Sequence, residues 1–170
     1  MNIKVYRNYL EINSLKDLNY SQKPNENCNL NCINPPDFQI NKFFYKQIGN
    51  DHRWTDRLVW NNQKWINYIE DQKVKTYVLQ DKENIIGYCE QIFHFEQKNC
   101  EIAYFGILKE YYGKKYGGFL LSESIKNLFK DGIERVWVHT CSLDHEYALK
   151  NYQARGMKIF KFETINLDIN

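Results

Sequence analysis

The amino-acid sequence predicts a mixed α/β domain, and three observations support this prediction. Segments of alternating β-branched and aromatic residues are interspersed with segments whose apolar residues recur at helical spacing. In the middle of the chain, strand-like segments follow one another through short polar turns, which is typical of an antiparallel meander. A strand–helix–strand unit over residues 100–140 then predicts a right-handed crossover and a local parallel pairing of strands.

The N-terminal part of the chain predicts one strand, one irregular insertion and two helices. Residues 2–10 are rich in β-branched and aromatic residues and predict the strand. Residues 13–37 are expected to form an irregular insertion, because Asn, Pro, Ser and Cys dominate most of it with little periodicity. Residues 38–48 carry apolar side chains at helical spacing, and Asn61 or Asn62 is expected to cap a second helix.

The remainder of the chain predicts further strands and helices within a single domain. The strands are expected at residues 75–79, 85–93, 100–108, 135–140 and 159–167. One helix is expected from about Phe119 to Lys130, and another from a cap at Asp144 to Gly156. Because the chain shows no repeat, low-complexity tract or linker, residues 1–170 are predicted to form one domain.

Composition argues against several classes of protein. The 23 basic and 21 acidic residues leave a net charge of +2, which gives no broad electrostatic reason to bind nucleic acid or an anionic membrane. No apolar run approaches the roughly 20 residues of a spanning helix, and the N-terminus lacks a signal peptide's apolar stretch, so we expect a cytoplasmic protein. Five scattered cysteines suggest reduced thiols. Cys28 and Cys32 are followed by no second ligand pair, so no metal is expected.

The most informative segment for function is residues 105–118, in which a predicted strand runs into a glycine-bearing turn and then a helix. Free amides at a helix start attract phosphate, and glycines let an anion approach the backbone closely. Lys114 and Lys115 add positive charge to this turn. The segment matches neither a P-loop nor a dinucleotide-binding fingerprint. A glycine-rich helix start without a ligand is the alternative interpretation.

This segment resembles the acetyl-CoA motif of the GCN5-related N-acetyltransferases, [Q/R]-x-x-G-x-[G/A]. Residues 112–117 read Y-G-K-K-Y-G, with departures from the motif at Tyr112 and Lys115. Residues 135–157 resemble a bacterial subgroup of that family that reads V-W-V-H-T-C-x-L-D-H. The resemblance spans residues 38–165 and includes R-W-T-D-R-L-V-W at residues 53–60.

The resemblance implies the fold of that family: a mostly antiparallel central sheet with one splayed parallel strand pair, flanked by about four helices. It implies acetyl-CoA as the cosubstrate, with its pantetheine arm between residues 104–108 and 135–140 and a β-bulge at Gly106. The expected cofactor-binding residues are Phe105, Gly106, Ile107, Leu108, Gly113, Lys114, Lys115, Tyr116, Gly117, Gly118 and His145.

The resemblance also implies candidate catalytic residues. Tyr152 occupies the position of a tyrosine that protonates the leaving thiolate, although packing of the last helix is the alternative. Glu90 and Glu101 lie on predicted strands beside the cleft and are candidate bases for the amine. The alternative for each carboxylate is a solvent-facing residue or an ion pair, for instance with Arg57.

Trp54, Asp56 and Arg57 are expected to form an acceptor pocket in which Asp56 attracts a cationic amine. The alternative is a pair of core tryptophans with a charged rim. The expected function is direct transfer of an acetyl group from acetyl-CoA to a primary amine of a small molecule or peptide, by a monomer or homodimer. A catalytically degenerate acyl-CoA-binding sensor or interaction module, or a peptide-binding domain, stays open as an alternative.

Overall fold

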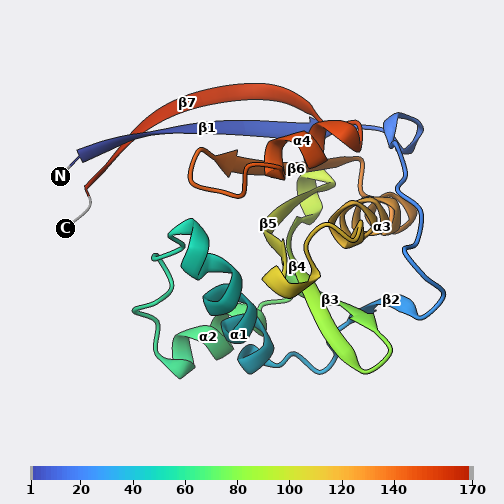
Figure 1. The fold of residues 1–170 in the computed structure, drawn as a ribbon, viewed down its shortest axis with the longest axis horizontal. Helices are drawn as coiled ribbons and strands as arrows, with labels where there is room; N and C mark the ends of the chain where they lie inside the picture. Colours follow the sequence, from blue (N-terminus) through green and yellow to red (C-terminus); the bar gives the residue numbers. More distant parts are fainter. Residues whose placement is uncertain (1, 169–170) are drawn as a thin grey trace.

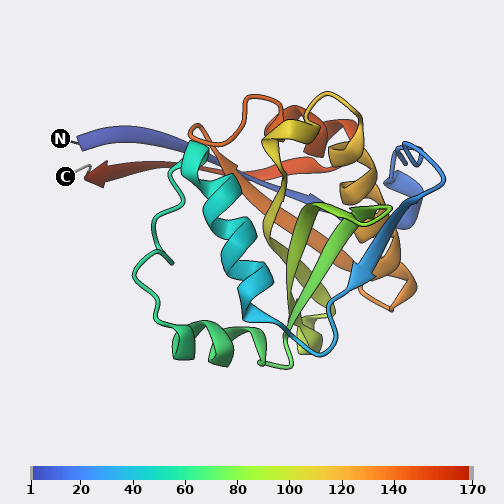
Figure 2. The same ribbon diagram turned by 60° about the horizontal axis from the view of Figure 1, so that its bottom comes forward.

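The computed structural model describes residues 2–168, which form one seven-stranded sheet in the order β2-β3-β4-β5-β6-β1-β7 (Figures 1 and 2). Within these residues, β5 and β6 are parallel and all other neighbouring strands are antiparallel. The strands are β1 (Asn2–Ile12), β2 (Cys28–Cys32), β3 (Val74–Asp81), β4 (Asn84–His94), β5 (Asn99–Ile107), β6 (Arg135–Cys141) and β7 (Lys158–Asp168). The α-helices are α1 (Phe38–Gly49), α2 (Asn62–Ile69), α3 (Tyr116–Lys130) and α4 (Ala148–Ala154). The mixed α/β fold predicted from the sequence is confirmed.

The helices cover opposite faces of the sheet. The apolar stripe of α3 buries Leu120, Leu121 and Ile125 in the larger core, together with side chains from β1, β4 and β6. On the other face, Phe44 and Ile48 of α1 pack in a smaller core with residues of β3 and β4. Figure 2 shows α1 and α2 on one side of the sheet and α3 on the other.

The starts of α1 and α2 are each fixed by a side-chain cap. The Asp37 carboxylate accepts a hydrogen bond from the Gln39 amide at the start of α1. The Asn61 side chain accepts from the Lys64 amide, which confirms Asn61 as the cap of α2. Such caps satisfy amides that have no partner within the helix.

The N-terminal strand β1 lies between β6 and the C-terminal strand β7 in the sheet. It pairs with β6 on one side and along its length with β7 on the other. Its pairing with β6 begins at Arg7, and Tyr6 bonds to Ser142 just after β6, so residues 2–5 pair with β7 alone and extend beyond the rest of the sheet (Figure 1). This arrangement brings the N-terminal strand beside the strand that carries His139.

Three local features differ from the sequence-based expectation. The segment expected to be irregular contains β2, a polar strand that pairs with β3 at the sheet edge. Its sequence, C-N-L-N-C, alternates apolar and polar residues, and Cys28 and Leu30 face the larger core. The strand is only five residues long and contains two Asn residues, which are rare in strands, so this alternation is a weak signal. Helix α3 begins at Tyr116, so Gly117 and Gly118 lie in its first turn.

The third difference concerns Asp144, which does not cap α4. That helix begins after Tyr147 without a side-chain cap. The Asp144 carboxylate instead accepts hydrogen bonds from the Cys141 amide at 2.8 Å and the Thr140 hydroxyl at 2.7 Å. These bonds close a tight turn after β6, which is the local structure that Asp favours when it is not capping a helix.

Candidate active site

The site begins where β5 and β6 separate. Their parallel pairing ends at Ile102 and Val138, and the β5 residues beyond this point have no partner on β6. The pairing of β4 with β5 skips Ala103, which is therefore the bulged residue. The splay implied by the family resemblance is confirmed, but the expectation of a bulge at Gly106 is wrong.

Gly106 has a different reason to be glycine. A Cβ atom at this position would lie 2.8 Å from Cγ2 of Ile48 on α1. The missing side chain therefore lets α1 pack closely over β5. This close packing forms one wall of the gap between the splayed strands.

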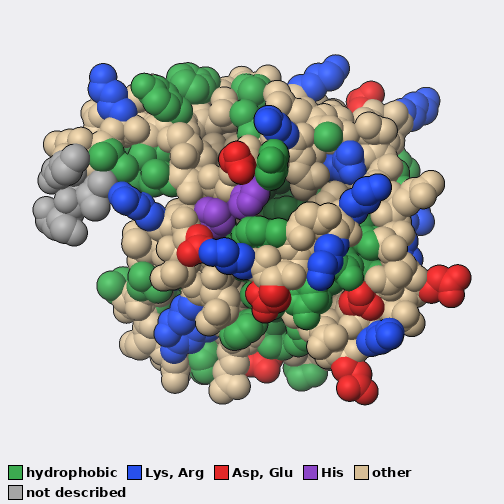
Figure 3. Space-filling view, in the orientation of Figure 1, with side chains coloured by type: hydrophobic (Ala, Val, Ile, Leu, Met, Phe, Trp, Pro, Cys, Tyr) green, Lys and Arg blue, Asp and Glu red, His purple; other side chains and the backbone are tan. Residues whose placement is uncertain are grey.

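A cavity of about 900 Å³ opens at this gap. Figure 3 shows it as a hollow with an apolar floor and histidine side chains at its edge. The predicted site residues that line it are Trp54, Asp56, Phe105, Gly106, Ile107, Gly113, Lys115, Tyr116, Gly117, Gly118, His145 and Tyr152. The predicted site residues that do not line it are Arg57, Glu90, Glu101, Leu108 and Lys114. Leu108 belongs to the core under α1, and the Lys114 ammonium lies over the Tyr111 ring.

One end of the cavity is formed by the turn before α3. Gly113 and Lys115 have φ values of 75° and 66°, in the left-handed region. Within the part of the chain that the structure describes, the amides of residues 113–118 donate no hydrogen bond. Free amides at the start of a helix, with the helix dipole behind them, form an anion-binding site.

Gly117 leaves room for a ligand at this end. A Cβ atom placed on it would project toward Asn151 and Ile107, at 3.7 and 3.8 Å, and would occupy the lining of the cavity. Lys115 adds positive charge at the same place. The residues present therefore fit a phosphate-bearing ligand that approaches the backbone closely.

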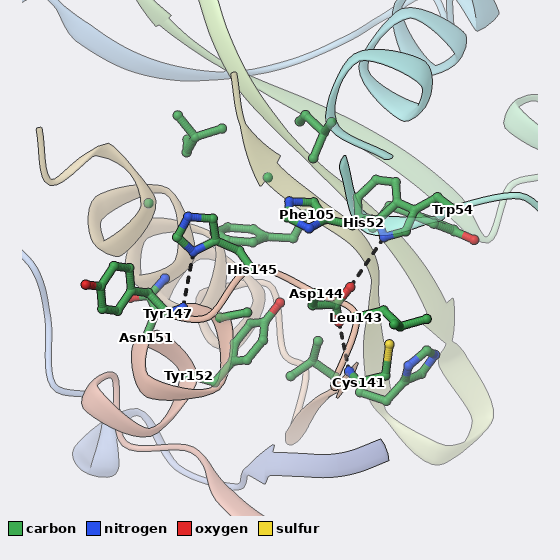
Figure 4. A pocket seen from close by; sticks show the side chains of 18 of the residues that line it. His52, Trp54, Phe105, Cys141, Leu143, Asp144, His145, Tyr147, Asn151 and Tyr152 are labelled. Atoms are coloured by element: carbon green, nitrogen blue, oxygen red, sulfur yellow. Dashed lines mark hydrogen bonds between the residues drawn. The ribbon is translucent and has the colours of Figure 1, made fainter. Parts of the chain in front are cut away.

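Tyr152 lies further along the cavity, on α4 (Figure 4). Its ring packs against Phe105 of β5, with centroids 6.1 Å apart. Burial raises the pKa of the Tyr152 phenol above its ordinary value, and the nearby Asp144 carboxylate adds to this effect. The hydroxyl is therefore protonated at neutral pH and is able to donate a proton.

Asp144 connects the two walls of the cavity. Besides closing its own turn, its carboxylate accepts a hydrogen bond from the Trp54 indole at 3.4 Å (Figure 4). Trp54 belongs to the loop between α1 and α2, so the bond ties this loop to the segment after β6. At the mouth of the cavity, the His145 ring packs edge-on against Tyr112 at 4.9 Å, and its Nδ1 accepts from the Tyr147 amide.

The wall opposite Tyr152 carries an exposed carboxylate. Asp56 lines the cavity, and each of its two carboxylate oxygens accepts a hydrogen bond from a tyrosine hydroxyl. Tyr45 of α1 donates to Oδ1 at 2.7 Å, and Tyr104 of β5 donates to Oδ2 at 2.9 Å. The predicted placement of Trp54 and Asp56 beside the cleft is therefore what the structure shows.

Arg57 and Glu90 form a buried ion pair behind this wall. Arg57 Nη1 lies 2.8 Å from Glu90 Oε1. Glu90 also accepts hydrogen bonds from the Tyr68 hydroxyl and from the Asn41 amide, the latter at 2.8 Å. The ion pair that the sequence left open for Glu90 is present, and this carboxylate is enclosed away from the cavity.

Two further titratable groups lie near the gap. Glu101 of β5 is half-buried, and burial raises its pKa above the ordinary value for a glutamate. His139 of β6 lines the cavity, and its pKa is lowered by burial and by the positive charge of Arg7. His139 is therefore neutral at neutral pH.

The sequence reasoning did not identify Arg7 or Asn151 as site residues. Arg7 of β1 lines the cavity with its Nε buried and without a partner among the described residues. No local motif marks it, because only the pairing of β1 with β6 places it there. Asn151 of α4 also lines the cavity. The only signal for it in the sequence is that a polar residue stands one position before Tyr152.

Two features are absent from the part of the chain that the structure describes. No group of three or more His, Cys, Asp or Glu side chains within residues 2–168 is arranged to hold a metal ion. None of the helices there is long and apolar enough to cross a membrane.

Together, these features define a protein with a split sheet whose gap opens into one cavity, with free helix-start amides at one end and the exposed Asp56 carboxylate in its lining. The family model described as the Acetyltransferase (GNAT) family matches residues 38–157. The chain therefore belongs to the GNAT family of acetyltransferases, whose members use acetyl-CoA. No curated protein sequence matches the chain. The resemblance of residues 135–157 to a bacterial subgroup stays a prediction.

Solved structures share the fold. A GCN5-related N-acetyltransferase from Sphaerobacter thermophilus superposes with a TM-score of 0.74 and 14% identity, over 95% of this chain and 50% of that chain. An aminoglycoside acetyltransferase from an uncultured soil metagenomic sample has a TM-score of 0.65 and 12% identity, over 78% of this chain and 90% of that chain. A GCN5-related N-acetyltransferase from Kribbella flavida has a TM-score of 0.64 and 12% identity, over 95% of this chain and 56% of that chain. The chain thus spans about half the length of the Sphaerobacter and Kribbella proteins.

Proposed function

We propose that this chain transfers an acetyl group from acetyl-CoA directly to a primary amine, with both bound at once in the cavity. One observation carries the proposal. A single cavity connects the free amides at the start of α3 with the Tyr152 phenol and the Asp56 carboxylate, along the gap between β5 and β6. Holding two reactants together in this way supplies much of the rate enhancement in such reactions.

The residues of the cofactor half fit acetyl-CoA. The free amides of residues 113–118 and the Lys115 ammonium are placed to bind the pyrophosphate, and Gly117 keeps the approach open. Residues 105–107 of β5 have no partner on β6 and therefore offer backbone groups to the pantetheine arm. Acetyl-CoA, when bound there, supplies the activated acetyl group as a thioester.

The proton transfers are assigned to two side chains. Tyr152 donates a proton to the sulfur as the carbon–sulfur bond breaks and the amine nitrogen bonds to the carbonyl carbon. A base must remove one proton from the amine. Glu101 serves as this base, because its raised pKa makes its carboxylate a better proton acceptor. Since Glu101 does not line the cavity, the proton reaches it through an ordered water. Glu90, enclosed by Arg57 and its hydrogen-bond donors, serves another purpose.

Release of free CoA from acetyl-CoA tests this proposal. The assay uses a panel of diamines, monoamines, amino acids, aminoglycosides and short peptides, with mass spectrometry of each amine. We expect acetylation of at least one class and no CoA release without an amine. Binding of acetyl-CoA with no amine acetylated would instead identify an acyl-CoA sensor, and absence of binding would contradict both functions.

A further inference from the structure

The buried ion pair behind Asp56 has no evident purpose in stability or direct binding. Arg57 is 6% exposed and Glu90 is fully buried. Replacing such a pair by apolar residues often leaves a protein equally or more stable, so stability alone does not account for it. Neither residue lines the cavity, so direct contact with a ligand there does not account for it either.

The ion pair is connected to the cavity by two tyrosines. The Arg57 guanidinium carbon lies 5.9 Å from the Tyr45 ring centroid and 4.2 Å from that of Tyr104. The Arg57 amide also donates to the Tyr45 hydroxyl oxygen at 3.0 Å. The hydroxyls of these two tyrosines hold the two oxygens of Asp56. The position of the Asp56 carboxylate therefore depends on the position of Arg57, which Glu90 fixes.

Asp56 faces the cavity with its negative charge unpaired. The charge of Arg57 is matched by Glu90, and none of the ion pairs among residues 2–168 includes Asp56. The rings of Trp54 and Tyr104, 4.8 Å apart and edge to face, line the cavity beside it. An exposed carboxylate next to aromatic rings is suited to an organic cation.

We propose that Asp56 is a binding subsite for an ammonium group of the acceptor other than the amine that is acetylated, held in position by Arg57 and Glu90. This inference rests on the proposed acetyl transfer. An amine must be neutral to attack a thioester, whereas a neighbouring carboxylate favours its protonated form. Asp56 is therefore matched to a second amino group, so the acceptor belongs to the diamines and polyamines.

Calorimetry in the presence of CoA tests the subsite with a homologous series of straight-chain diamines and the monoamines of equal length. We expect the best diamine to bind about tenfold or more tightly than its monoamine, the usual worth of a charge-assisted hydrogen bond. Asp56→Asn should abolish this preference. Tyr104→Phe keeps the ring over Arg57 but deletes one hydroxyl, and should remove most of the preference.

Tyr20→Phe is the matched control. The Tyr20 hydroxyl donates to the Glu123 carboxylate at 2.6 Å, away from Asp56, so its loss should leave the diamine preference unchanged. Equal binding of diamines and monoamines by the wild-type protein would overturn the proposal, as would a preference that survives in both Asp56→Asn and Tyr104→Phe. If calorimetry shows the preference but no amine is acetylated, the transfer function fails while the subsite stands.

Glu90→Gln tests the positioning role. It removes the charge that balances Arg57 while keeping the side-chain shape, so it should raise the diamine KM about tenfold with little change in kcat. The monoamine KM should stay constant, whereas a merely structural defect would change both. Glu90→Asp should restore part of the difference. Should Glu90→Gln not fold, Tyr104→Phe tests whether the diamine preference requires the Asp56 carboxylate to be held in position, because this variant leaves the ion pair intact.

Discussion

At the scale of single residues, the cavity contains groups whose protonation states are set by their surroundings. Tyr152 and His139 lie in the same cavity and are both partly removed from water. Burial disfavours the charged form of each, so the phenol stays protonated and the imidazole stays neutral at neutral pH. The protonated phenol of Tyr152 is able to supply the proton that the proposed acetyl transfer requires, and the neutral imidazole of His139 adds no positive charge to the cavity.

The change Tyr152→Phe deletes the proposed proton donor and keeps the ring against Phe105. We expect turnover to fall by roughly 10²-fold or more, the usual contribution of a general acid. Acetyl-CoA affinity and the melting temperature should stay nearly constant, because packing is retained. Steady-state kinetics and a melting curve on the same preparation measure this. A Phe variant that turns over at the wild-type rate would make Tyr152 a packing residue.

His139 makes the stability of the protein depend on pH. Its folded-state pKa lies below the ordinary value of 6.5, because burial and Arg7 disfavour the imidazolium. As the pH falls below about 6.5, the unfolded chain binds a proton that the folded chain does not, and stability decreases. Between about pH 7.5 and 5.5 the wild type should therefore lose more stability in urea titrations than His139→Gln. If the two proteins lose equal stability, this assignment is wrong. His139→Gln also lacks the neutral imidazole, so its kinetics are measured separately.

At the scale of elements, the function depends on how strands and helices end. β5 and β6 stop pairing halfway, and α3 begins at a turn whose amides stay free. Neither feature adds stability to the sheet. Both leave backbone donors and acceptors without a partner at one cavity. A ligand bound there is able to form the missing hydrogen bonds.

Gly117→Val should block the approach of the pyrophosphate to the first turn of α3. The space that its Cβ would enter is bordered at 3.7 Å or more, so the fold tolerates a side chain there while the cavity does not. We expect CoA affinity to fall by about tenfold or more, as for the loss of a hydrogen bond to a charged group. Calorimetry measures the affinity, and an unchanged melting temperature without ligand is the control. Normal CoA binding would place the phosphate site on another turn.

Gly156 ends α4 at a point of close contact with the segment after β1. Its φ is 97°, and a Cβ atom there would lie 2.0 Å from the Asp17 carbonyl oxygen. Gly156→Ala should therefore destabilise the protein by about 3 kcal/mol or more, through backbone strain and steric overlap. Gly132→Ala is the matched control, because its φ of 89° is similar but its Cβ would meet nothing within 4 Å. Gly132→Ala should lower the free energy of unfolding by only about 1–2 kcal/mol. Equal losses in urea titrations would contradict the role of the Asp17 contact.

At the scale of the whole molecule, the cavity is shared by elements from both ends of the chain. Arg7 comes from β1, Asp56 from the loop before α2, and Tyr152 from α4. A ligand that spans these elements stabilises their common arrangement and binds the unfolded chain weakly. Ligand binding should therefore be visible in the stability of the entire domain.

Acetyl-CoA should raise the melting temperature with increasing concentration. At a hundred times its Kd, a ligand specific for the folded state adds about 2.7 kcal/mol. For a domain of this size that corresponds to roughly 5–10 °C. Thermal melts over a concentration series measure the shift, and adenosine, which lacks the pyrophosphate, is the control. An unchanged melting temperature at millimolar acetyl-CoA would contradict the cofactor assignment.

The parts of this protein that could be predicted from its sequence are those set by neighbours in the chain. The meander, the cap of α2 and the glycine-bearing turn before α3 all depend on residues that lie within a few positions of one another in the chain. The edge strand β2 was not predicted, because its alternation of apolar and polar residues covers only five positions and two of them are Asn, which is rare in strands. Asp144 was assigned to a helix cap because the same residue type suits a cap and a turn equally.

The sequence by itself therefore determined the fold class, the order of the longer strands and the helices, and the glycine-bearing turn before α3, since periodicity and glycine placement are local properties. Only the tertiary structure decided how the wall around Asp56 is built. Tyr45, Asp56 and Tyr104 meet through hydrogen bonds between segments that are far apart in sequence, and Glu90 is removed from the cavity by its ion pair with Arg57. Which donor finds which acceptor across a packed core depends on how the helices and the sheet are placed against each other, and no local pattern encodes that placement.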